Sequence, residues 1–309
     1  MRSAQTDEHG FYELYLTPED WRIQPHRVDS DTTAISAMDA SYVLQAAYGS
    51  RWLSWKQQQA CDVSGDGALD GYDAWLIMNR RAGYVPRFPV ADSCGSDWIF
   101  DPAPAIIASQ WLVKPKVEGD SCRPGSITLH PLNSVENQTF QAILFGDCTG
   151  NWLPNAVVGG AGFDGQRDLQ ATLRLGRIRR SRSGRMWMPV YVRASEPVFA
   201  VDLALRYDAR RVRAAGVRVL PAARSMMLVS NDTEPGVLLM ALAGAEALPE
   251  DRGAVAAIYF REVAPQRAVS AVSPTGVRTS RPAVRIDQAY VDEVPLHTDD
   301  TATAQTSER

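Results

Sequence analysis

The chain has 309 residues, of which 45% are hydrophobic and 22% are charged, and its formal net charge is −4. This length allows two or three domains with separate cores, and the composition is that of a globular protein. The slightly acidic balance argues against a general nucleic-acid binder, and no apolar run approaches the roughly 18 residues that span a bilayer.

The first 28 residues are predicted to form two short strands, at 11–16 and 21–25, because apolar and polar residues alternate there. Two strands alone are marginally stable in water. Residues 6–12 resemble the end of a prealbumin-like β-sandwich repeat of secreted proteins. The resemblance implies that residues 1–28 are the remnant of an upstream repeat, and that an extracellular or cell-surface protein has its signal peptide farther upstream.

An internal repeat follows. Residues 35–44 align without gaps on residues 69–78, and Gly49 and Gly83 come at the same offset after the two copies. Glycine is the usual stop signal of a helix, and apolar residues recur at helical spacing in both copies. The sequence therefore predicts two helices whose apolar faces pack together.

The second copy overlaps the end of a loop, residues 62–73, that has the spacing of an EF-hand calcium site. A hard cation needs six or more oxygens, and the loop needs a glycine at position 6 for its sharp turn, which Gly67 provides. An Asp- and Gly-rich surface turn is the alternative. The predicted calcium ligands, at loop positions 1, 3, 5, 7, 9 and 12, are Asp62, Ser64, Asp66, the backbone carbonyl of Ala68, Asp70 and Asp73.

An aspartate at position 12 and the paired loop–helix repeats resemble a dockerin module over residues 29–88, which we extend to residue 152. In dockerins, loop positions 10 and 11 and the following helix recognise a cohesin partner. The resemblance thus implies calcium as the cofactor and a set of partner-binding residues. That set is Gly71, Tyr72, Met78 and Asn79 in one copy, with Ala37 and Met38 in the other.

The first copy lacks the front half of its loop, since positions 1, 5 and 6 fall on Val28, Thr32 and Thr33. A register one residue shorter uses Asp29, Asp31 and Asp39 but closes only eleven residues. Residues 147–151 carry oxygens at positions 1, 3 and 5 without a helix after them. A split site is therefore predicted from Asp147, Thr149, Asn151, Ser36 and Asp39, the alternative being a plain turn after a strand.

Residues 89–145 are expected to be an insertion of irregular structure and a few strands, at 98–100, 127–129 and 140–145. The four cysteines allow three pairings, or four buried thiols. Because Cys61 and Cys148 both border loop-like segments, we predict Cys61–Cys148 with Cys94–Cys122. Disulfides imply an oxidising compartment.

After a Gly-rich linker, residues 153–167, the pattern changes to short strands with Gly, Pro and Asp turns, which predicts an all-β jelly-roll sandwich over 168–292 and a disordered tail over 293–309. Residues 188–192, 198–208 and 253–260 resemble a cohesin. The expected strands are 169–175, 186–192, 199–206, 212–220, 226–229, 237–242, 254–260 and 284–291.

The chain is thus predicted to be a noncatalytic, calcium-dependent scaffolding or adhesion protein that uses dockerin–cohesin recognition. Its partners would be cohesin- or dockerin-bearing proteins, or its own two modules. No H-E-x-x-H or G-x-S-x-G motif supports an enzyme. The alternative is a carbohydrate-binding sandwich, which needs exposed aromatics on one face. The basic run 177–185 is expected to be a solvated turn because no aromatic residues interleave.

Overall fold

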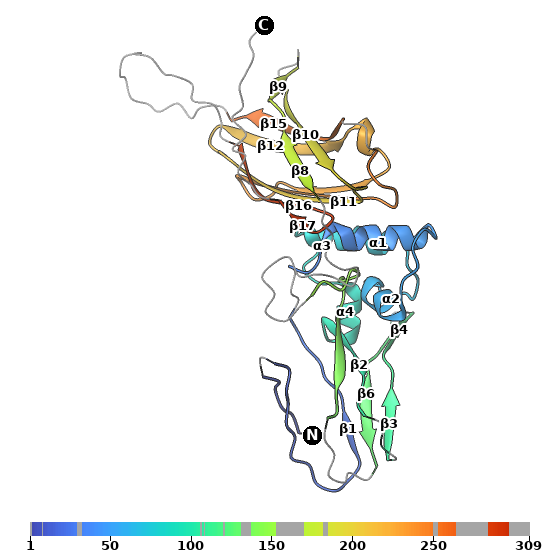
Figure 1. Ribbon diagram of the computed structural model, residues 1–309. Coiled ribbons are helices and arrows are strands. Elements are labelled where there is room, and N and C mark those ends of the chain that lie inside the picture. The colour runs from blue at the N-terminus through green and yellow to red at the C-terminus, as the bar shows by residue number, and fades with distance from the viewer. Residues whose placement is uncertain are drawn as a thin grey trace, which may run out of the picture. The chain divides into compact units, whose positions relative to one another are not determined.

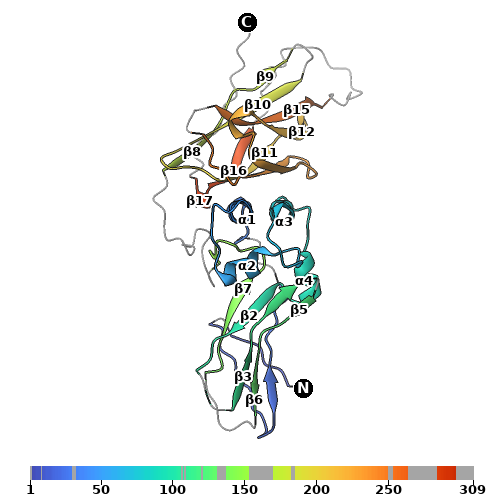
Figure 2. The ribbon, with the colours of Figure 1, turned by 90° about the vertical axis from the view of Figure 1, so that its right-hand side faces the viewer.

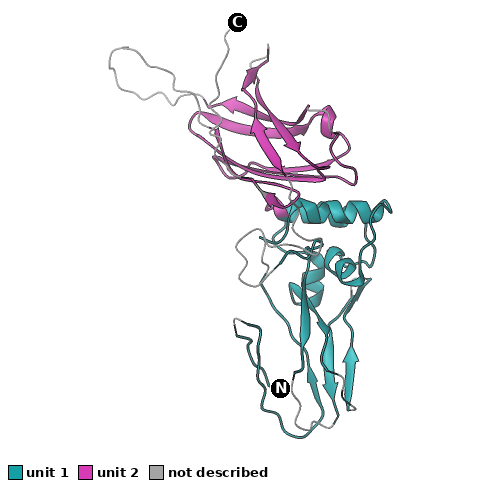
Figure 3. Cartoon of the chain, in the orientation of Figure 1, with its two compact units in different colours: residues 1–80, 85–166 teal, residues 81–84, 167–309 magenta. Residues whose placement is uncertain are grey.

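The computed structural model describes residues 2–7, 9–29, 33–105, 107, 109–119, 121–130, 137–152, 170–181, 185–249, 253–263 and 284–296. The chain divides into two compact units (Figure 3), residues 1–80 with 85–166, and residues 81–84 with 167–309. The predicted linker and residues 297–309 of the predicted tail lie outside the described ranges. Within those ranges, every helix is too short or too polar to cross a membrane.

The two predicted repeat helices are present in the first unit. Helix α1, Ala37–Ala47, begins with a capping box in which Ser36 and Asp39 bind each other's backbone N–H groups. Helix α3 spans Gly71–Arg81. Gly49 and Gly83 follow the two helices with φ of 74° and 80°, a left-handed conformation that favours glycine. The helices lie side by side in Figures 1 and 2.

Two further helices were not predicted. Helix α2, Trp55–Cys61, is capped by Ser54, which forms a capping box with Gln57, and helix α4 spans Pro89–Cys94. The S-x-x-Q spacing before α2 was a readable start signal. Since α2 ends where the loop 62–73 begins and α3 follows it, the loop lies between an entering and an exiting helix.

The strands of the first unit come mainly from the insertion. Strands β2, Trp98–Pro102, and β7, Phe140–Leu144, pair with each other, as do β4, Lys116–Glu118, and β5, Ser121–Arg123. A third sheet has the order β1-β6-β3. Its strands are β1, Trp21–Ile23, β6, Ser126–Leu129, and β3, Gln110–Val113.

Strand β1, in the N-terminal segment, pairs with a strand of the insertion. Strand β1 pairs antiparallel with β6, Trp21 lying opposite Leu129 and Ile23 opposite Ile127. Ile127 and Leu129 are buried, so β1 completes a sheet of the insertion. The prediction of a strand at 11–16 is wrong, because these described residues form no regular secondary structure.

Both predicted disulfides are present. Cys61–Cys148 and Cys94–Cys122 have Cα–Cα separations of 5.2 and 5.0 Å, inside the range that a disulfide spans. The first pair joins the end of α2 to the segment after β7, and the second joins α4 to β5. The two bonds are consistent with an extracellular protein.

The second unit is a sandwich of two antiparallel sheets, which confirms the all-β prediction (Figure 1). One sheet has the order β12-β15-β10-β8, with β9 also pairing with β10, and the other has the order β13-β14-β11-β16-β17. The first contains β8 (Ala171–Leu175), β9 (Arg179–Arg180), β10 (Met186–Ala194), β12 (Val212–Val219) and β15 (Ala254–Glu262). The second contains β11 (Ala200–Tyr207), β13 (Met227–Asn231), β14 (Val237–Ala243), β16 (Val284–Val291) and β17 (Val294–Pro295).

All eight predicted strands correspond to observed ones, with ends shifted by a few residues. Alternation explains the agreement, because every second side chain of a strand faces the core between the sheets. Leu205, Leu238 and Ile258 are fully buried there. Strand β17 and a short 3₁₀ turn, Pro221–Ala223, were not predicted, and β17 falls in the segment expected to be a disordered tail.

Candidate functional site

The contiguous loop, residues 62–73, has the turn that its sequence predicts. Gly67, at position 6, has φ of 88°, a conformation that residues with a Cβ rarely adopt. Asp62 accepts hydrogen bonds from the backbone N–H groups of Gly65 and Gly67, at 2.8 and 2.9 Å. The first carboxylate thereby fixes the front half of the loop.

The carboxylate at position 12 connects the front of this loop with its back. Asp73 Oδ1 accepts from Ser64 N at 2.9 Å, and Asp73 Oδ2 accepts from Asp70 N at 3.1 Å. Asp66 and Asp70, at positions 5 and 9, each accept from the backbone N–H two residues on. The four aspartates of this loop therefore all accept hydrogen bonds from the loop's own backbone.

The split loop, residues 147–152 with 36–39, is assembled from the two predicted segments. Thr149 N donates to Asp39 Oδ1 at 2.9 Å, across 110 positions of sequence, and Ser36 N donates to Asp39 Oδ2 at 2.7 Å. Asp147 accepts from the backbone N–H groups of Asn151 and Trp152, at 3.0 and 3.1 Å. The structure thus brings together the five residues of the predicted second site.

The two loops correspond position by position. In both, the carboxylate at position 12 accepts from the backbone N–H groups of positions 3 and 9. In both, the carboxylate at position 1 accepts from the N–H of position 6, which is Gly67 in one loop and Trp152 in the other. The split loop is therefore the same loop with its chain connection interrupted between positions 6 and 9.

Three contacts hold the front half of the split loop in place. The disulfide Cys61–Cys148 connects the residue before position 1 of the contiguous loop to position 2 of the split loop, and Gly146 N donates to Ala60 O at 2.7 Å. On the other side, Trp152 packs edge-on against Trp98, with ring centroids 4.6 Å apart. No sequence pattern pointed to this aromatic pair.

Four carboxylates of the two loops are buried: the exposed fractions of Asp39, Asp62, Asp73 and Asp147 are 0%, 3%, 1% and 7%. Burial disfavours the charged form of a carboxyl group. It raises the pKa of Asp62, and it raises the pKa of both Asp73 and Asp147 to about 6, against backbone hydrogen bonds that lower it.

The donor set fits a hard cation. Among the described residues, no three or more His, Cys, Asp or Glu side chains form a metal-binding group by themselves. The split loop has only two carboxylates, and its other oxygens belong to Ser36, Thr149 and Asn151. Asn151 Oδ1 is buried and has no hydrogen-bond partner within the described part of the chain, which leaves it available as a ligand. Oxygen-only donors of mixed charge suit Ca²⁺.

The shorter register of the first loop is not the one that forms. Asp29 instead binds Arg27 through both carboxylate oxygens and accepts from the indole Nε1 of Trp98 at 3.3 Å. Asp31 lies outside the described ranges. The segment that contacts Asp39 is instead the one after β7.

The predicted partner-binding residues differ in exposure. Gly71 is exposed, and Tyr72 is 52% exposed and stacks on Trp75, with ring centroids 5.8 Å apart. The remaining four, Ala37, Met38, Met78 and Asn79, are buried. Tyr72 and Trp75 form a surface feature of the kind that recognition sites use, and Trp75 was not predicted.

No family model and no curated protein sequence matches the chain. Solved cohesin structures match part of it. The sixth cohesin of scaffoldin B from Acetivibrio cellulolyticus, in a complex with a dockerin, is 14% identical, with a TM-score of 0.29, over 40% of this chain and 89% of that one.

Two further matches are of the same kind. A type I cohesin–dockerin complex of Clostridium thermocellum gives 13% identity and a TM-score of 0.31 over 41% of this chain and 91% of the other. The non-cellulosomal cohesin of Archaeoglobus fulgidus gives 15% and 0.29, over 41% and 83%. All three matches concern about 40% of this chain, at identities of 13% to 15%.

Proposed function

We propose that the first unit is a dockerin-like module ordered by two calcium ions, and that the chain acts in calcium-dependent protein–protein recognition between this module and a cohesin-like sandwich. The observation that carries the proposal is the duplicated hydrogen-bond pattern. In both loops, the contiguous one and the split one, the carboxylate at position 12 accepts from the backbone N–H of position 3. Each loop also begins beside a cysteine of the same disulfide.

Burial of the carboxylates explains why a cation would control folding here. The four carboxylates have almost no contact with water. Burying their negative charges raises the free energy of the folded state unless a cation neutralises them. Ca²⁺ binding free energy at such loops adds directly to folding stability. The ligands Ser36 and Asp39 lie at the start of α1, and Asp70 and Asp73 lie at the start of α3, so a bound ion would order both helices.

The recognition step is supported by the exposed Tyr72–Trp75 pair on α3 and by the presence of a cohesin-like sandwich on the same chain. Aromatic side chains supply large contact areas at interfaces. The partner of each module is the other type of module, on another cohesin- or dockerin-bearing protein or on this chain.

The test is an association assay between a fragment of residues 1–152 and a fragment of residues 170–296. The first fragment contains the described helices and strands of the first unit with both disulfides, and the second contains all the strands of the sandwich and their core. We expect association in 1 mM calcium that is lost in chelator. A matched control carries Asp62→Asn and Asp147→Asn in the first fragment and should not associate. Equal association with and without calcium, or none in calcium, would contradict the proposal.

A further inference from the structure

The two sheets of the sandwich differ in charge. Strands β8, β9, β10, β12 and β15 contain one acidic residue, Glu262, and seven arginines: Arg174, Arg179, Arg180, Arg193, Arg213, Arg218 and Arg261. Strands β11 and β16 of the other sheet contain two arginines, Arg206 and Arg285, and two aspartates, Asp202 and Asp287. The positive charge therefore gathers on one sheet of a chain that is acidic overall.

Three of these arginines lie over aromatic rings of the same sheet. The guanidinium of Arg174 is 4.4 Å from the ring centroid of Tyr191, that of Arg179 is 5.1 Å from Trp187, and that of Arg218 is 5.4 Å from Tyr259. We call these six residues the arginine–aromatic face. Of the other two tyrosines on the strands of the sandwich, Tyr207 lies in the core and Tyr290 belongs to the other sheet.

Strand register places two of the three pairs directly opposite each other, while Arg218 lies opposite Ala257, two residues before Tyr259 on the same face of β15. Arg179 lies opposite Trp187, and Trp187 lies opposite Tyr259, so one row crosses β9, β10 and β15. Arg174 lies opposite Tyr191 in a second row. Residues opposite each other in a sheet share a face, so the cations and rings form one continuous surface. Sequence reasoning missed it because each arginine and its ring come from different strands.

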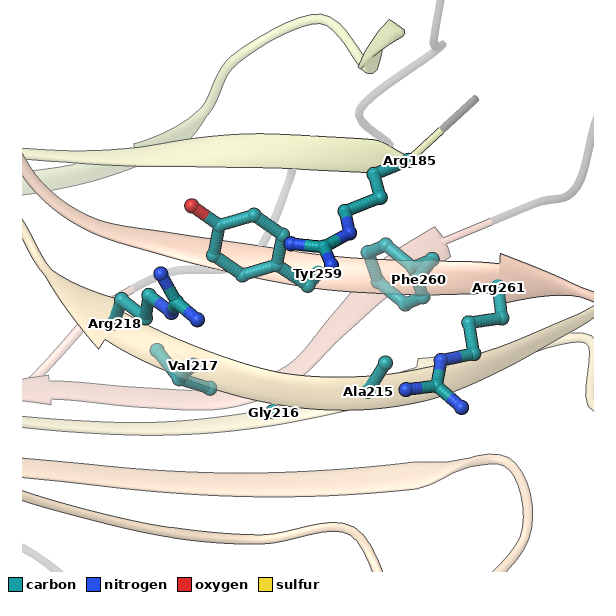
Figure 4. Close-up of a pocket in the computed structure, with 8 residues that line it drawn as sticks. All are labelled: Arg185, Ala215, Gly216, Val217, Arg218, Tyr259, Phe260 and Arg261. Carbon is teal, nitrogen blue, oxygen red and sulfur yellow. The ribbon is translucent and has the colours of Figure 1, made fainter. Parts of the chain in front are cut away.

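A hollow of about 190 Å³ opens at the edge of this face (Figure 4). Arg185, Arg218 and Arg261 surround it, with the ring of Tyr259 between them. The hollow lies beside a register shift in β12 between Ala214 and Val217, where Gly216 has φ of 99°. A bulge of this kind bends an edge strand and opens space next to it.

The three arginines that lie over rings are not neutralised by neighbouring acidic side chains of the described residues. Arg180 pairs with Glu262, while Arg174, Arg179 and Arg218 form no ion pair within the part of the chain that the structure describes. Cation–π contact orients a guanidinium without neutralising it. The forked N–H donors of an oriented guanidinium match the two oxygens of a carboxylate.

We propose that the arginine–aromatic face binds a linear acidic polysaccharide through its uronate carboxylates. This activity lies beyond the proposed protein–protein recognition. Planar, oriented guanidinium groups spread over one sheet face suit carboxylates repeated along a chain. Base stacking or neutral sugars would need ring faces that the guanidinium groups here cover.

The test measures binding of the full chain to sodium polygalacturonate by isothermal titration calorimetry, in chelator so that calcium cannot bridge to the first unit. We expect saturable binding that weakens as salt rises. Arg179→Gln with Arg218→Gln should weaken it about tenfold or more, while the matched pair Arg206→Gln with Arg285→Gln, which removes equal charge from the other sheet, should change it less than about twofold.

Arg179→Lys with Arg218→Lys separates geometry from charge, since lysine keeps the charge but has no fork. A loss between those of the glutamine and control variants supports carboxylate recognition. No binding to polygalacturonate, equal losses in the two glutamine pairs, or tighter binding to neutral dextran or to a single-stranded oligonucleotide would each overturn the proposal. Because chelator is present throughout, these outcomes do not depend on whether calcium-dependent recognition holds.

Discussion

The contiguous loop and the split loop reach the same arrangement in different ways. In the contiguous loop, Asp62 and Asp73 are joined by ten intervening residues and a glycine turn. In the split loop, Asp147 and Asp39 are 108 positions apart, and β7, the disulfide to Cys61 and the Trp98–Trp152 contact bring them together. The same hydrogen-bond pattern is therefore made by neighbouring residues in one loop and by distant segments of the first unit in the other.

This difference has an energetic consequence. Closing a long chain segment costs more conformational entropy than closing a short one, by roughly 0.6 kcal/mol for each doubling of length. The split loop depends on other contacts to offset that cost. Its calcium affinity should therefore fall when those contacts are removed. The contiguous loop should retain affinity when distant contacts are removed.

The largest expected effect comes from replacing Cys61 and Cys148 by alanine. The variant should lose about 2–5 kcal/mol of unfolding free energy, since this bond closes a segment with a sequence separation of 87. It should also lose calcium from the split loop while the contiguous loop keeps its ion. Urea unfolding followed by tryptophan fluorescence, together with a count of bound calcium, measures both effects.

The pair Cys94→Ala with Cys122→Ala is the matched control. Its sequence separation is 28, so the stability loss should be smaller by about 1 kcal/mol. Both loops should keep their calcium in this variant. If both cysteine variants reduced calcium binding equally, the specific dependence of the split loop on Cys61–Cys148 would be wrong.

The next effect concerns the carboxylate at position 1 of each loop. Asp62→Asn and Asp147→Asn should each lower the bound calcium from two ions to one per chain, because each removes a charged ligand from one loop only. At calcium a hundredfold above the dissociation constant, each loss removes about 2.7 kcal/mol of ligand-linked stability. Equilibrium dialysis gives the count, and unchanged stoichiometry in Asp147→Asn would rule out the split site.

The smallest effect concerns position 5, which is Asp66 in the contiguous loop and Asn151 in the split loop. Calcium affinity rises with the number of charged ligands. Asn151→Asp should therefore strengthen calcium binding at the split loop about tenfold, and Asp66→Asn should weaken it at the contiguous loop by about the same factor. Calorimetric titration of each variant resolves the two affinities. If Asn151→Asp changed the affinity of the contiguous loop, or Asp66→Asn that of the split loop, the position-by-position correspondence would be wrong.

Local patterns accounted for much of this molecule. The 34-residue repeat predicted α1 and α3, and two-residue alternation predicted the eight main strands of the sandwich, because helix and strand periods are visible in neighbouring residues. The cysteine pairing followed from the position of Cys61 and Cys148 beside similar loops. Helix α2 was missed although its capping signal was present, and β1 was assigned to an upstream repeat because its partner, β6, lies about 100 residues away.

The sequence alone determined which residue types stand at each position of both loops, since the spacing of Asp, Ser, Thr, Asn and Gly is a local property. Tertiary structure was needed for three features: the return of residues 147–152 to Asp39, the Trp98–Trp152 contact that holds them, and the rows of arginine over aromatic rings on β8, β9, β10, β12 and β15. In each, side chains from distant segments meet through strand register, disulfide geometry and burial, which local periodicity does not encode.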